Sequence, residues 1–134
     1  MEKLRVESGI EIEANAAGDI ITIPIDDMNF IENYNVLLEQ FERVDRELGE
    51  KEGTMSSREE LKFIISKTRE IMDGINTLFA DKDCCKKVFG DIVPSPWLIA
   101  DFLEKLCPLV EKYASERQKR IMTKYKKPVR TRRG

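Results

Sequence analysis

The hydrophobic pattern of the chain changes its period within residues 20–27, which read Ile20-Ile21-Thr22-Ile23-Pro24-Ile25-Asp26-Asp27. Ile21, Ile23 and Ile25 alternate with other residues, which is the period of a half-buried β-strand. The two aspartates that follow are residues that cap helices, and the apolar positions after them recur at steps of three and four. This stretch therefore predicts a strand that leads into an amphipathic helix.

The residues before this stretch predict a partner strand. Asn15-Ala16-Ala17-Gly18-Asp19 supplies turn residues. Upstream of the turn, the unbroken parity favours one strand, with or without a bulge, over two strands divided at Ser8-Gly9. The apolar residues at even positions are Leu4, Val6, Ile10, Ile12 and Ala14. We therefore expect a β-hairpin over about residues 3–25.

The isoleucine face of this hairpin needs a partner, because two strands alone are marginally stable in water. It must pack on helices or pair with another subunit. Pro24, on the opposite parity, indicates the edge of a sheet. Ile21, Ile23 and Ile25 are therefore the candidate residues of a self-association edge.

Two long helices are predicted after the hairpin. The first carries apolar residues from Phe30 to Leu48 on one face and is expected to end at Gly49. The second opens with a capping box at Ser56 or Ser57. Its apolar stripe is assigned to the core: Leu61, Ile64, Ile65, Thr68, Met72, Ile75 and Phe79. Joined by a short loop, the two helices should form an antiparallel pair.

The next segment predicts a short helix. Asp81 or Asp83 can cap it, and Gly90 is placed to end it. Val88 and Phe89 are expected to point inward.

Ser95 and Pro96 provide the N-cap and first-turn proline of a last helix, whose apolar face runs from Ile99 to Tyr113. Pro108 removes one backbone hydrogen bond, so it predicts a kink or two shorter helices. The predicted fold is α+β, an N-terminal β-hairpin packed on a mainly α-helical bundle of four to five helices. The helices cover about residues 26–114, and residues 1–116 form one domain.

Composition agrees with a soluble helical domain. Of the 134 residues, 41% are hydrophobic and 36% are charged, which argues against low-complexity disorder. The N-terminus lacks the apolar stretch of a signal peptide, and no apolar run approaches the roughly 20 residues of a membrane span. We expect a cytoplasmic protein that does not enter the membrane.

Charge divides the chain into an acidic body and a basic end. Residues 117–134 contain nine basic and no acidic residues, whereas residues 1–116 carry 14 basic and 25 acidic ones. We expect a basic, partly disordered tail that contacts a partner, with nucleic-acid binding as the alternative. The candidate contact residues are Arg117, Lys119, Arg120, Lys124, Lys126, Lys127, Arg130, Arg132 and Arg133.

The sequence offers no catalytic constellation. It has no histidine, which removes imidazole as a general base, nucleophile activator or metal ligand. It also lacks the glycine-rich phosphate loops and the nucleophile elbow. We predict a non-enzymatic protein without metal or cofactor.

The three cysteines, Cys84, Cys85 and Cys107, have no C-x-x-C spacing. They are expected to be buried thiols, with a reactive Cys84 near a helix N-terminus as the alternative.

Trp97 is the one tryptophan of the chain. Beside Pro96, it is a candidate aromatic anchor for a partner. Burial at the start of the last helix is the interpretation that the pattern favours.

Several short strings together resemble the small tail assembly chaperones of tailed phages and prophages of Gram-positive bacteria. They are the hairpin ending at Ile23-Pro24-Ile25-Asp26-Asp27, the helix over residues 30–48, the segment over residues 84–90 and the run Phe102-Leu103-Glu104-Lys105-Leu106-Cys107-Pro108 before a basic end. The resemblance rests on order, length and short strings, and it supplies no client-binding residues.

This resemblance implies a non-catalytic role in the bacterial cytoplasm. Such a protein coats the long tape-measure protein during tail assembly and keeps it soluble, and it is expected to self-associate. The family often makes a longer form by ribosomal frameshifting. The alternative function is a small nucleic-acid-binding or regulatory protein that uses the basic tail.

Overall fold

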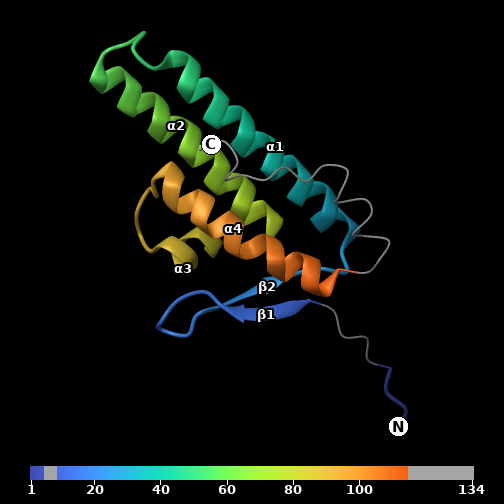
Figure 1. Ribbon diagram of the computed structural model, residues 1–134. Coiled ribbons are helices and arrows are strands. Elements are labelled where there is room, and N and C mark those ends of the chain that lie inside the picture. Colours follow the sequence, from blue (N-terminus) through green and yellow to red (C-terminus); the bar gives the residue numbers. More distant parts are fainter. Residues whose placement is uncertain (5–8, 115–134) are drawn as a thin grey trace.

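The computed structural model describes residues 1–4 and 9–114, and it has the α+β architecture that the sequence predicts. A two-stranded antiparallel hairpin lies across one end of a group of four helices (Figure 1). No helix within the described residues is both long and apolar enough to cross a membrane.

The hairpin consists of β1 (Ile10–Glu13) and β2 (Ile20–Ile23), in a register that pairs Ile10 with Ile23. Strand β1 is shorter than predicted. Gly9 has φ +86°, and a Cβ atom there would lie 2.8 Å from Cγ2 of Thr22. Glycine is therefore needed at this position. Leu4, expected in the strand, is exposed and lies in no strand, and residues 5–8 lie outside the described residues.

Helix α1 (Met28–Lys51) begins where the two aspartates predicted it. The Asp27 carboxylate accepts a hydrogen bond from the Asn29 backbone N–H at 2.9 Å, which satisfies a donor of the first turn. Contrary to the prediction, the helix continues through Gly49 to Lys51. Nothing lies within 4 Å of a Cβ atom at Gly49, so this glycine is simply an exposed helical residue.

Helix α2 (Ser57–Leu78) runs antiparallel to α1, as predicted (Figure 1). Of the two possible capping boxes, the one at Ser56 forms. Its hydroxyl accepts from the Glu59 backbone N–H at 3.2 Å, and the Glu59 carboxylate accepts from the Ser56 N–H at 3.0 Å. Ser57 is the first helical residue.

Helix α3 (Cys84–Phe89) ends at Gly90, which has φ +85°. Asp83 makes no side-chain cap here. Instead, the Asp81 carboxylate accepts from the Asp83 backbone N–H at 2.9 Å, so Asp81 orders the turn before the helix.

Helix α4 (Pro96–Tyr113) starts at the predicted cap, where the Ser95 hydroxyl accepts from the Leu98 N–H at 3.2 Å. It continues as one helix through Pro108, so the division into two helices is wrong. Pro108 is tolerated because it removes one helical hydrogen bond while the apolar face on either side of it stays buried.

The core lies where the hairpin, α1, α2 and α4 meet. Ile21, Ile23 and Ile25 are 2%, 0% and 4% exposed. They pack with fully buried residues of the helices: Phe30, Leu37, Ile75, Ile99, Leu103 and Val110. A self-association edge made of these three side chains is therefore incorrect, because the same chain's helices already cover them.

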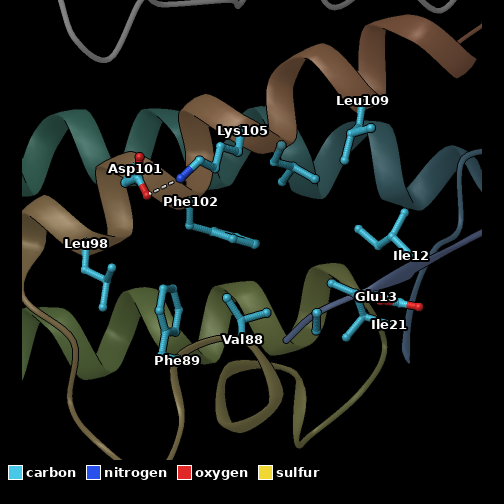
Figure 2. Close-up of a pocket in the computed structure, with 12 residues that line it drawn as sticks. Ile12, Glu13, Ile21, Val88, Phe89, Leu98, Asp101, Phe102, Lys105 and Leu109 are labelled. Carbon is cyan, nitrogen blue, oxygen red and sulfur yellow. Dashed lines mark hydrogen bonds and ion pairs between the residues drawn. The ribbon is translucent and has the colours of Figure 1, made fainter. Parts of the chain in front are cut away.

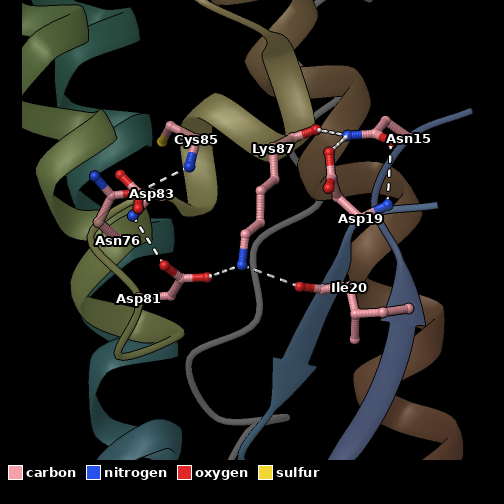
Figure 3. A network of polar contacts seen from close by, with 8 residues as sticks. All are labelled: Asn15, Asp19, Ile20, Asn76, Asp81, Asp83, Cys85 and Lys87. Carbon is pink, nitrogen blue, oxygen red and sulfur yellow. Dashed lines mark hydrogen bonds and ion pairs between the residues drawn. The ribbon is translucent and has the colours of Figure 1, made fainter. Parts of the chain in front are cut away.

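A polar network fastens α3 to the hairpin (Figure 3). Lys87 Nζ donates to the Asp81 carboxylate at 2.8 Å and to the Ile20 carbonyl at 3.2 Å. Asn15 Nδ2 donates to the Lys87 carbonyl at 2.8 Å. The hydrogen bond from Lys87 lowers the pKa of Asp81. Because Lys87 of α3 donates to a backbone carbonyl of β2, this network holds α3 against the hairpin.

Candidate apolar binding site

Within residues 1–4 and 9–114, no three or more histidine, cysteine or acidic residues gather as metal ligands would. Cys84 and Cys85 are buried, and loss of solvation raises the pKa of each thiol to about 12. The alternative of a reactive Cys84 is therefore wrong, because burial opposes the thiolate.

Helix α4 instead separates two apolar hollows. Its buried face consists of Ile99, Leu103, Leu106 and Val110. Trp97 lies beside one hollow and Leu98 beside the other, and both side chains are exposed, by 75% and 39%. The first turns of α4 therefore present apolar groups on two sides.

The first hollow, here called the hairpin groove, lies between the hairpin, α3 and α4 (Figure 2) and has a volume of about 310 Å³. Phe102 and Phe89 face one another across it, with ring centroids 5.5 Å apart in an edge-on arrangement. Asp101 and Lys105 form an ion pair of 2.8 Å beside it. The remaining lining residues are Ile12, Glu13, Ala14, Ile21, Val88, Leu98, Leu106 and Leu109.

The second hollow, here called the Trp97 groove, lies between the loop-side ends of α1 and α2 and the start of α4, and has a volume of about 630 Å³. Three of its exposed residues are apolar, namely Trp97, Leu61 at 56% and Val93 at 37% exposure. The other apolar lining residues are Phe41, Leu48, Ile64, Ile65, Pro94, Pro96 and Ala100.

The position of this groove follows from the lengths of the helices. The α1–α2 pair extends past the start of α4 (Figure 1), so α4 covers only part of the apolar stripe of α2. Thr68, Ile71, Ile75 and Leu78 are buried, whereas Leu61 is exposed and Ile64 and Ile65 are half-buried. The assignment of the whole α2 stripe to the core was therefore wrong at its first two turns.

The structure also corrects the interpretation of Trp97. The favoured interpretation, burial at the start of α4, is wrong, because three quarters of the side chain is exposed. Large apolar side chains that gather on a surface are typical of binding sites, and tryptophan is enriched among interface residues that carry affinity. The role of Trp97 as a partner anchor stays a prediction.

The polar part of the Trp97 groove is acidic. Asp45, Glu52 and Glu60 line it, together with Gly49, Thr68 and Ser95, and none of its lining residues within the described chain is a lysine or arginine. The ion pairs found among the described residues do not include Glu52 or Glu60. The groove therefore combines an apolar surface with negative charge, which suits an amphipathic segment with positive flanks.

The predicted contact residues of the basic tail, Arg117 to Arg133, lie outside the described residues. The site brings Trp97 together with Leu61 and Val93, which sequence reasoning did not join to it. The apolar stripe of α2 begins two turns before Thr68, but whether α4 covers those turns depends on the offset between the two helices, which local sequence patterns do not contain.

Comparison of the chain with protein-family models, with curated proteins and with solved structures gives no match.

Proposed function

We propose that this protein is a non-catalytic tail assembly chaperone of the phage or prophage type, and that it binds a helical segment of a tape-measure protein in the Trp97 groove. The observation that supports this best is the exposed Trp97 side chain at the edge of an apolar groove between α2 and α4.

The groove has the chemistry that a helical client needs. An amphipathic helix binds by laying its apolar face in a groove, which removes apolar surface of both partners from water. Leu61 and Trp97 provide that surface, and the charged outer faces of α1 and α2 keep the complex soluble. A chaperone of a long helical protein needs both properties.

The test is co-expression with a long, helix-rich candidate partner of the tape-measure type, followed by co-purification at moderate salt. We expect a soluble complex with a partner that is insoluble alone. Trp97→Ala and Leu61→Ser should weaken it by about 30-fold, since truncating an interface anchor costs about 2 kcal/mol.

Two matched variants control for general damage. Tyr113→Ala removes an exposed ring from the other end of α4, and Val36→Ser replaces an exposed apolar residue of α1 outside both grooves. Both should leave the complex intact. Absence of a complex with the unaltered chain would refute the chaperone function, and equal losses from all four variants would refute the groove as its site.

The alternative, nucleic-acid binding through the basic tail, is favoured only by the charge of residues 117–134. It predicts retention on DNA or RNA that falls steeply between ~50 and ~200 mM salt as counterions are released. Truncation after Glu116 should abolish that retention, and Trp97→Ala should not affect it.

A further inference from the structure

We propose that the Trp97 groove is the docking site of the chain's own basic C-terminal segment, residues 115–134, in the same molecule. This inference concerns the free protein and does not depend on the client proposed above. It rests on three observations: the charge of the groove, the composition of the segment and the distance between them.

Charge complementarity is the first observation. Asp45, Glu52 and Glu60 line the groove without any basic residue among the described lining, and residues 117–134 carry nine basic and no acidic side chains. Opposite charges favour such a pairing and set its register. Their attraction is screened beyond about 8 Å at physiological salt, so the contact must be close.

The second observation is the apolar content of the segment. Ile121, Met122 and Tyr125 are spaced so that a helix would place them on one face. Basic residues flank them on both sides, at Arg120 before Ile121 and at Lys126 and Lys127 after Tyr125. An apolar stripe with positive flanks matches an apolar groove with acidic lining.

Distance is the third observation. Ala114, the last described residue, follows Ala100 of the groove by fourteen positions, about 21 Å along the axis of α4. Six residues can span at most about 20 Å, so the twenty residues that follow Ala114 in the sequence are more than enough to reach the level of Ala100 and Trp97. The connection is short, so the local concentration of the segment is of millimolar order.

Docking of this segment would cover the exposed apolar residues of the free protein. A client that occupies the same groove must then displace it. The basic end would therefore act as an internal competitor that protects Leu61 and Trp97 from nonspecific contacts.

Trp97 reports on this contact directly, because it is the one tryptophan of the chain and lies in the groove. The test measures its emission wavelength and its quenching by acrylamide in the full chain, at low protein concentration and low salt. We expect Ile121→Ser/Tyr125→Ser to shift the emission to the red and to increase quenching. Val129→Ser, in the same segment, should change neither.

A second pair of double variants tests the acidic residues of the groove. Glu52→Gln/Glu60→Gln should give the same red shift. Glu32→Gln/Glu39→Gln removes equal charge from α1 away from the groove and should not shift the emission. Salt near 1 M, where the screening length is about 3 Å, should expose Trp97 in the unaltered chain. Helical circular dichroism should stay constant throughout.

Three results would overturn the proposal. One is identical Trp97 emission and quenching in the unaltered chain and in both groups of docking variants. Another is shielding of Trp97 that grows with protein concentration, which would assign the groove to the segment of a second copy. The third is shielding that survives both the tail variants and high salt.

Discussion

At the scale of single residues, Ile23 shows how the hairpin is held. Its side chain is completely buried, whereas Ile20 on the same strand is 41% exposed. Ile23→Ala should therefore lower the free energy of unfolding by about 2–5 kcal/mol, because it leaves a cavity among the helices. Ile20→Ala should have little effect. Chemical denaturation followed by circular dichroism measures both values.

A charged substitution at Ile23 distinguishes a core position from an interface position more clearly than Ile23→Ala does. Since the side chain lies in the core of the monomer, Ile23→Asp should abolish the folded helical signal. A variant that stayed folded and only lost self-association would contradict the burial described above.

At the scale of elements, the start of α2 depends on one of two adjacent serines. Ser56 forms the capping box, and Ser57 is the first residue of the helix. Ser56→Ala should destabilise the protein by about 0.5–2 kcal/mol, because the Glu59 backbone N–H loses the Ser56 hydroxyl as its acceptor. Ser57→Ala is the matched control and should be close to neutral. The midpoints of thermal unfolding of the two variants should differ, and equal midpoints would show that Ser56 does not cap α2.

At the scale of the whole molecule, Cys84 and Cys85 report on opening of the core. Both are buried, and burial raises the pKa of each thiol to about 12. Near pH 8 the native protein should therefore protect both from a thiol reagent, and they should react together as the fold opens. Mass spectrometry of the labelled chain measures this. Rapid labelling of either residue without denaturant would contradict the packing of α3.

Local patterns predicted the fold class and most element starts. The Asp27, Ser56 and Ser95 caps and the end of α3 at Gly90 depend on neighbouring residues, so the sequence contains the information that places them. Local patterns failed at Gly49, because the low helix propensity of one exposed glycine is too small to end α1. They also failed at Pro108, where burial of the apolar face on either side outweighs one lost hydrogen bond.

The Trp97 groove could not be predicted in this way. Periodicity showed that Leu61 and Ile75 share a face of α2. The same reasoning placed Trp97 at the start of a helix and favoured its burial. Whether such a face is covered depends on how far α4 extends along α2, which is a contact between segments distant in the chain. The residues therefore specified the helices, the hairpin and the division of charge. The offset between helices, a property of tertiary packing alone, left Leu61 and Trp97 uncovered and buried Ile21, Ile23 and Ile25.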